Sequence, residues 1–82
     1  MVKLRQLAHA QALSRHGNFR RAVGAVHLSQ PALSRSIRSL EEALGVMLFD
    51  REGPEVMPTP YGEALLRRTA TLLSETQELE RD

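Results

Sequence analysis

The sequence predicts a mainly helical fold with three short helices, a two-stranded β-ribbon and a long C-terminal helix. Three observations support this prediction. Apolar residues recur at spacings of three and four through residues 4–44, a strand–turn–strand pattern follows at 46–58, and leucines then repeat every seven residues. The chain has 82 residues and no cysteine, so we expect a single domain that folds without disulfides.

The first helix is predicted to end at Gly17, because glycine commonly terminates helices. Asn18 is a favourable N-cap for a second helix over 19–28. Gly24 inside this second helix disfavours it by about 1 kcal/mol relative to alanine, so tertiary contacts must support it. The first helix is indicated by the spacing of three between Leu4, Leu7, Ala10 and Leu13. In the second helix, the residues expected to face inward are Phe19, Ala22, Val23 and Val26.

A third helix with two different faces is predicted over 30–44. Ser29 is suited to cap it, Pro31 is tolerated in its first turn, and Gly45 ends it. The face predicted to be buried comprises Leu33, Ile37, Leu40 and Leu44. The opposite face comprises Gln30, Ser34, Arg35 and Arg38. Amide, hydroxyl and guanidinium groups suit DNA base edges and phosphates, and two helices joined this closely predict a helix-turn-helix.

The segment after the third helix predicts a wing, which is a two-stranded β-ribbon. Residues 46–51 are apolar and strand-like, 52–55 have turn chemistry, and 56–58 form a short return strand. Pro58 indicates that the return strand is brief or lies at an edge, because proline has no N–H to donate. Residues 1–58 are therefore predicted to form a winged helix-turn-helix DNA-binding domain.

A long linker helix is predicted over 59–82, with Thr59 as its N-cap and Pro60 at its first position. A seven-residue leucine repeat is typical of a helix that pairs with another helix, so we predict that this helix dimerises. The alternative is that it packs on its own domain, which we expect of its first turns. The predicted dimer interface, called the heptad face below, comprises Leu65, Leu66, Thr69, Leu72, Leu73, Thr76 and Leu79.

Charge is distributed unevenly along the chain. Residues 1–51 contain eight Lys and Arg against three Asp and Glu, whereas residues 52–82 contain three against seven. The basic part suits a polyanion, and the acidic helix suits a different partner. The alternative for Arg35 and Arg38 is an ordinary solvated helix face, and the alternative for Arg20 and Arg21 is an ordinary exposed pair.

Several classes of function are disfavoured. No apolar run is long enough to span a membrane, and the N-terminus does not have the pattern of a targeting segment. His9, His16 and His27 have neither cysteine partners nor paired-ligand spacing, which argues against a metal site. The sequence contains no glycine-rich phosphate loop and no catalytic constellation. We therefore predict that the protein is not an enzyme and uses no metal or cofactor.

The chain resembles the N-terminal DNA-binding region of LysR-type bacterial transcriptional regulators over nearly its whole length. The resemblance rests on several blocks in a fixed order. These are Gly17-Asn18-Phe19 before Ala22, Leu28-Ser29-Gln30-Pro31-Ala32-Leu33-Ser34, Ile37 with Leu40-Glu41, Leu44-Gly45, Leu48-Phe49-Asp50-Arg51 and Thr59-x-x-Gly62. The resemblance implies a cytoplasmic, nucleoid-associated homodimer, or a tetramer of the full-length protein, that binds an interrupted inverted repeat. It also implies that a small-molecule-sensing domain, absent from this chain, follows the linker helix.

The resemblance further implies roles for single residues, with the helix that starts at Gln30 in the major groove. Base contacts are expected from Gln30, Pro31, Ser34 and Arg35. Backbone contacts are expected from Asn18, Ser29, Arg38 and Arg51, and, on their charge at a helix N-terminus, from Arg20 and Arg21. The wing departs from the family pattern, because Glu52 and Glu55 would repel phosphates.

A rival prediction is a protein-interaction module in which the winged fold docks a partner and the arginines bind an acidic protein. That module would not bind duplex DNA at moderate salt. An enzyme is a more distant alternative, because the sequence offers neither paired catalytic groups nor a pocket-sized core.

Overall fold

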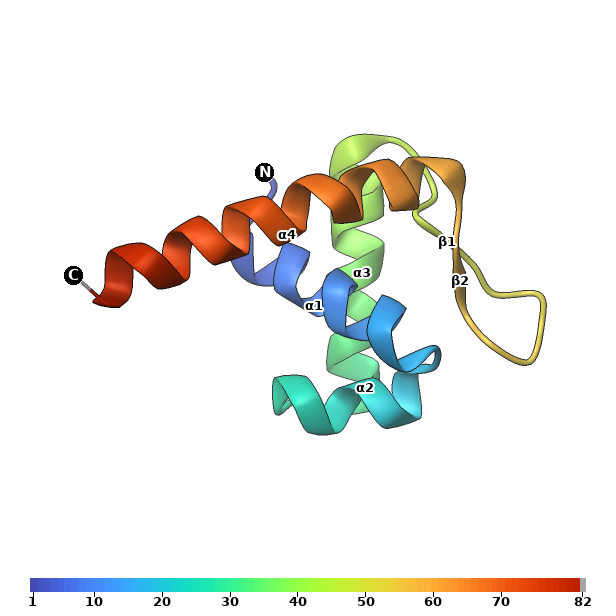
Figure 1. Cartoon of the computed structure of the whole chain (residues 1–82). Coiled ribbons are helices and arrows are strands. Elements are labelled where there is room, and N and C mark those ends of the chain that lie inside the picture. Colours follow the sequence, from blue (N-terminus) through green and yellow to red (C-terminus); the bar gives the residue numbers. More distant parts are fainter. Residues whose placement is uncertain (82) are drawn as a thin grey trace.

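The computed structural model describes residues 1–81, which form four helices and one short two-stranded sheet (Figure 1). The predicted linker helix over 59–82 therefore includes one residue, Asp82, that lies outside the described part. The elements in chain order are α1 (Leu4–His16), α2 (Phe19–Val26), α3 (Gln30–Leu44), β1 (Phe49–Asp50), β2 (Met57–Pro58) and α4 (Pro60–Arg81). Within residues 1–81, no helix is both long enough and apolar enough to cross a membrane.

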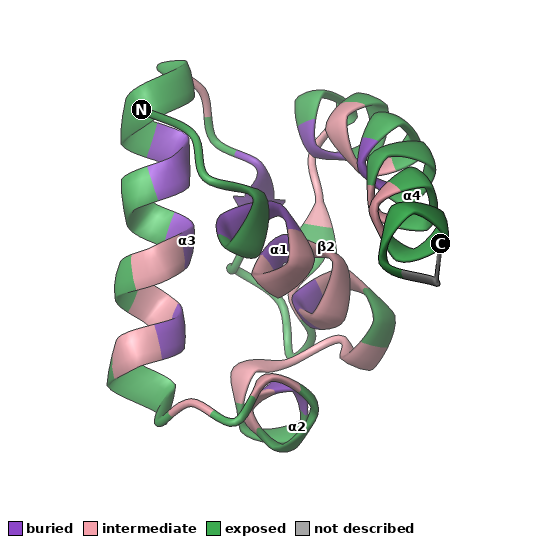
Figure 2. Cartoon of the chain, turned by 90° about the vertical axis from the view of Figure 1, so that its left-hand side faces the viewer, coloured by how far each residue is buried: buried purple, intermediate pink, exposed green. Residues whose placement is uncertain are grey.

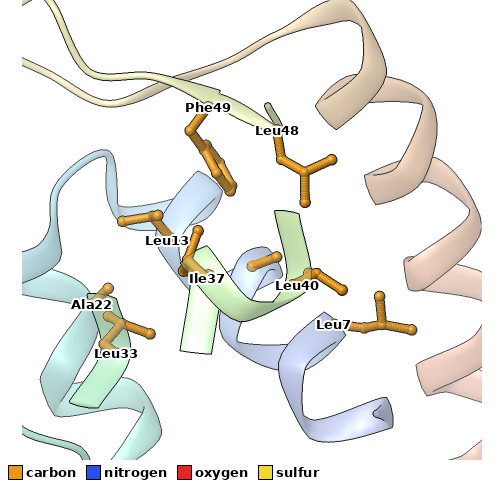
Figure 3. Close-up of a cluster of buried hydrophobic side chains, with 9 residues drawn as sticks. Leu7, Leu13, Ala22, Leu33, Ile37, Leu40, Leu48 and Phe49 are labelled. Atoms are coloured by element: carbon orange, nitrogen blue, oxygen red, sulfur yellow. The ribbon is translucent and has the colours of Figure 1, made fainter. Parts of the chain in front are cut away.

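Helix α1 is the centre of the fold. It contacts each of the other three helices, and in Figure 2 it lies between α3 on one side and α4 on the other. The core side chains come from α1, α2, α3 and the start of the wing, and they converge between these elements (Figure 3). They are Leu7, Ala10, Leu13, Ala22, Leu33, Ile37, Leu40, Leu48 and Phe49. Burial of each leucine or isoleucine contributes about 1.5–3 kcal/mol, which supplies the tertiary support that the short helix α2 requires.

The predicted helix ends are largely confirmed, because local capping contacts fix them. Gly17 ends α1 with a left-handed φ of 78°. The Asn18 side chain accepts a hydrogen bond from the Arg21 amide at 2.8 Å, and Ser29 Oγ accepts one from the Ala32 amide at 3.2 Å. Helix α2 ends two residues earlier than predicted, at Val26, because His27 takes a left-handed φ of 57°.

The wing strands are shorter than the sequence predicts. They pair antiparallel over two residues each, with Phe49 opposite Pro58 and Asp50 opposite Met57. The residues before β1 bond elsewhere. The Leu48 amide donates to the Glu41 carboxylate at 2.7 Å, and the Leu48 carbonyl accepts from the Thr59 amide at 2.9 Å. The segment entering the wing is therefore held by α3 and by the start of α4 rather than by a longer sheet.

Leu44 was predicted in the buried face of α3, and this prediction is wrong. Its side chain is 40% exposed, whereas Leu33, Ile37 and Leu40 are fully buried. The buried position in the last turns of α3 is taken by Glu41, which is only 6% exposed. A buried carboxylate is stable here because backbone N–H groups and an arginine surround it.

Helix α4 begins within the folded body and ends outside it. Leu65 and Leu66 pack against the core, and the C-terminal half of the helix projects beyond the other elements in Figure 1. The predicted division at residue 58 thus separates two segments that pack together. Thr69 corrects the predicted heptad face, because its side chain is fully buried within its own chain. A residue that its own chain covers completely is unavailable to a second copy.

Candidate nucleic-acid interface

Helix α3 presents its polar face to solvent. The side chains of Gln30, Pro31, Arg35 and Arg38 are exposed, and that of Ser34 is half-buried. The opposite face of α3 packs on α1 and α2, so the helix lies on the outside of the body in Figure 2. The exposed face is therefore free to meet a flat or grooved partner, and it offers hydrogen-bonding and cationic groups together.

A surface hollow brings three separate segments together next to this helix. It is bordered by Asn18, Phe19, Arg20, Arg21, Gln30 and Pro54. These residues belong to the start of α2, the start of α3 and the tip of the wing. Arg20 and Arg21 are exposed in the first turn of α2. Two cations beside a helix N-terminus provide a favourable environment for an anion such as a phosphate.

The acidic tip of the wing contacts the turn between α1 and α2, next to this hollow. The Val56 amide donates to the Gly17 carbonyl at 2.7 Å, which holds the wing to the turn between α1 and α2. The Glu55 carboxylate lies against Gly17, so closely that a side chain at Gly17 would overlap it. The structure therefore sets one negative charge against Gly17, the residue before the Asn18 cap.

Arg51 is the predicted backbone contact whose surroundings the sequence describes least well. Its guanidinium donates to the Glu41 carboxylate at 3.1 Å and lies 5.8 Å from the centroid of the Phe19 ring. The side chain is 34% exposed, so part of it remains accessible. The sequence patterns did not predict that Glu41 and Phe19 contact Arg51. The only indication in the sequence was that both residues stand in the blocks that resemble the LysR-type pattern.

Helix α1 also holds α3 through polar contacts. His9 Nδ1 lies 2.6 Å from Ser36 Oγ, and Gln6 Nε2 donates to Ser39 Oγ at 3.3 Å. Burial, together with the nearby positive charge of Arg5, lowers the pKa of His9 below its usual value. The surroundings of His9 therefore favour the neutral imidazole.

The heptad face divides into two parts along α4. Leu65 and Leu66 lie against the core, as we expected for the first turns. Farther along, Leu72 is 45% exposed and Leu79 is 75% exposed, whereas Leu73 and Thr76 are half-buried. Thr76 Oγ1 donates to the Leu72 carbonyl at 2.9 Å. The second half of α4 therefore leaves large apolar side chains in solvent, which a partner helix would cover.

The three helices, the helix-turn-helix connection and the short ribbon define a winged helix-turn-helix DNA-binding domain. A family model that describes the bacterial regulatory helix-turn-helix proteins of the lysR family matches residues 4–63 of this chain. The chain therefore belongs to the LysR family. This is a family of transcriptional regulators and not of enzymes, in agreement with the prediction from sequence.

Curated relatives agree with this assignment. The chain is 52% identical over 73 residues to the SDS degradation transcriptional activation protein of Pseudomonas sp. (strain ATCC 19151), covering 89% of this chain and 24% of that protein. It is 42% identical over 78 residues to the DNA-binding transcriptional dual regulator OxyR of Escherichia coli (strain K12), covering 95% of this chain and 26% of OxyR. The chain thus spans about a quarter of the length of the relatives it matches.

Solved structures match the fold over almost the whole chain. The crystal structure of a BenM_DBD/catB site 1 DNA complex has a TM-score of 0.93 at 32% identity, covering 98% of this chain and 86% of that one. The crystal structure of a CbnR_DBD–DNA complex has a TM-score of 0.90 at 30% identity, covering 98% and 92%. Full-length OxyR C199D from Pseudomonas aeruginosa has a TM-score of 0.93 at 32% identity, covering 99% and 28%.

Proposed function

We propose that this domain binds double-stranded DNA sequence-specifically as a homodimer on an interrupted inverted repeat, with α3 in the major groove. The observation that carries the proposal is the two-faced packing of α3. Its apolar face is buried on α1 and α2, while Gln30, Arg35 and Arg38 remain exposed. The DNA complexes of the two structural neighbours BenM_DBD and CbnR_DBD support this role.

The residues of α3 make two kinds of DNA contact, to base edges and to the backbone. Gln30, Pro31, Ser34 and Arg35 contact base edges, because they occupy the first two turns, where the N-terminal part of a recognition helix reaches the bases. Arg38, one turn farther along, contacts the backbone. An arginine in bidentate contact with guanine contributes about 1–3 kcal/mol of discrimination between bases.

Phosphate contacts come from the segments around α3. Asn18, Ser29, Arg20 and Arg21 are proposed as backbone contacts, and the hollow between α2, α3 and the wing tip supports the proposal for all but Ser29. Such contacts supply the sequence-independent, salt-sensitive part of the affinity.

Two copies pair through the second half of α4. The exposed Leu72 and Leu79 repeat at seven residues, and Leu73 and Thr76 flank them. Leu65 and Leu66 are partly covered by their own domain, so their share of the interface is the smaller one. A dimer built this way presents two copies of α3 to two half-sites, which is the geometry that an inverted repeat requires.

The experiment that tests the proposal is selection of bound duplexes from a random pool, followed by titration of the recovered duplex at two salt concentrations. We expect an inverted repeat, bound at least about a thousandfold more tightly than scrambled DNA. Recovery of no sequence, with only weak salt-sensitive binding, would contradict sequence-specific recognition by this domain. Recovery of a single half-site would contradict the dimeric arrangement.

A further inference from the structure

Glu41 holds the entrance of the wing to α3. Its Oε2 accepts hydrogen bonds from the Leu48 amide at 2.7 Å and from the Phe49 amide at 3.4 Å, and its Oε1 accepts one from Arg51 at 3.1 Å. The residue is only 6% exposed. Both carboxylate oxygens are therefore engaged, one by the backbone that leads into β1 and the other by a side chain just beyond β1.

Arg51 extends this connection from α3 to α2. Its guanidinium lies 5.8 Å from the centroid of Phe19, the first residue of α2. Phe19 directly follows the Asn18 cap and borders the hollow next to the recognition face. A single side chain thus links the end of α3, the wing and the start of α2. The proposed DNA interface uses the start of α2 and the earlier turns of α3, and the wing tip borders it.

The electrostatics oppose release of Arg51 from this position. Without Arg51, the Glu41 carboxylate would remain buried and would lose its only ion-pair partner among the described residues. Leaving a buried charge without its partner is strongly unfavourable. A phosphate that took Arg51 away would therefore have to overcome both this penalty and the loss of the stacking on Phe19.

We propose that Arg51 and Glu41 act together as positioning residues for DNA binding, which they support by fixing the wing against α2 and α3 rather than by a direct phosphate contact of Arg51. The inference rests on the proposed DNA-binding function. It revises the role expected for Arg51 and assigns a role to Glu41, a buried carboxylate that would repel a phosphate.

The two explanations predict opposite effects of Glu41→Gln. If Arg51 binds a phosphate directly, the substitution frees its guanidinium and removes a negative charge, so DNA affinity holds or rises. If the pair positions the wing, affinity falls, because glutamine has one oxygen and cannot serve both the backbone amides and Arg51. We expect a loss of about tenfold, equivalent to about 1.4 kcal/mol of binding free energy.

Arg51→Gln supplies a second, independent readout through the salt dependence. Loss of a direct phosphate contact lowers the slope of log affinity against log salt by about 0.9 for each contact. We expect Arg51→Gln to lose affinity with its slope unchanged, and Arg51→Gln combined with Glu41→Gln to lose no more than either single variant. A reduced slope, or losses that add, would overturn the proposal.

The measurements use the duplex recovered by selection, at a temperature where circular dichroism shows each variant folded. Glu63→Gln and Arg67→Gln make the same charge changes at exposed positions of α4 and serve as matched controls. If Glu41→Gln does not fold, the slope of log affinity against log salt measured for Arg51→Gln distinguishes the positioning role from a direct phosphate contact. Failure of the wild-type domain to prefer the duplex would refute the proposed function, whereas wild-type preference with full affinity in Glu41→Gln would refute only the positioning role.

Discussion

His9 and Ser36 join the centre of the fold to the recognition helix. Nδ1 of His9 lies 2.6 Å from Oγ of Ser36, so α1 holds α3 through a polar contact beside the apolar core. Ser36 lies between Arg35 on the exposed face and Ile37 on the buried face. We therefore expect the protonation state of His9 to be coupled to the packing of α3 on α1.

Acidification is expected to destabilise the domain through His9. The pKa of His9 is lowered in the folded state, first by burial and second by Arg5, so the unfolded chain binds a proton more readily. Stability from this group is fully present above the unfolded pKa of about 6.5 and is lost as pH falls through that value toward the folded pKa. Urea unfolding at pH 7.5 and pH 5 should show a larger loss for the wild type than for His9→Gln. Equal losses would contradict the coupling.

Two glycines are expected to respond oppositely to alanine. A Cβ at Gly62 would overlap the Leu48 carbonyl oxygen, whereas a Cβ at Gly24 would meet nothing within 4 Å. Gly62→Ala should therefore destabilise the domain by about 1–3 kcal/mol, because backbone must move. Gly24→Ala should stabilise it by up to about 1 kcal/mol, because α2 gains helix propensity. Urea unfolding of both variants checks the pair, and a stable Gly62→Ala would show that α4 can shift from Leu48.

Removal of the charge on Glu55 is expected to strengthen binding to any duplex. This carboxylate lies against Gly17, which directly precedes the proposed phosphate contact Asn18, and the neighbouring residue Pro54 borders the same hollow as Arg20 and Arg21. Glu55→Gln should raise affinity by about twofold to fivefold on specific and scrambled DNA alike, the scale of an exposed charge interaction. Glu52→Gln makes the same charge change at another exposed glutamate of the wing and serves as the matched control for DNA affinity. Weaker binding by Glu55→Gln would mean that its carboxylate mainly supports the wing.

Arg35 and Arg38 are expected to differ in the kind of affinity that they supply. Arg35→Ala should lower affinity for the selected duplex by about 1–3 kcal/mol more than for scrambled DNA, as loss of a base contact requires. Arg38→Ala should weaken both duplexes equally and reduce the salt slope. Fluorescence anisotropy titrations of the two variants on both duplexes make the comparison. An equal loss in Arg35→Ala would make that residue a phosphate contact.

Substitution of Leu79 is expected to weaken dimerisation without changing the folding stability of the monomer. Its side chain is 75% exposed, so Leu79→Glu should leave the unfolding free energy of the monomer within about 0.5 kcal/mol of wild type. The same substitution should weaken self-association, because it places a charge in the proposed helix pair. Sedimentation equilibrium measures this, with Thr71→Glu as an exposed control of the same charge. A dimer that persists unchanged in Leu79→Glu would contradict pairing through this part of α4.

Local sequence patterns predict most of the helix ends, with the end of α2 at Val26 as the exception. Asn18 and Ser29 cap helices through amides three residues away, and Gly17 and Gly45 end helices through their own backbone. These contacts join neighbours in the chain, so residue types alone predict them. The order of the elements and the exposed polar face of α3 followed from the same local patterns.

The tertiary structure alone decided which members of each pattern are buried and which polar groups meet. Periodicity placed Leu44 and Thr69 on their helix faces, but it could not show that Glu41 is buried near the end of α3 or that Thr69 is covered by its own chain. The ion pair of Glu41 with Arg51 and the close approach of Gly62 to Leu48 also join segments brought together by folding. Whether a residue is buried depends on which other elements pack against it. The residue pattern of a single helix does not show which elements these are.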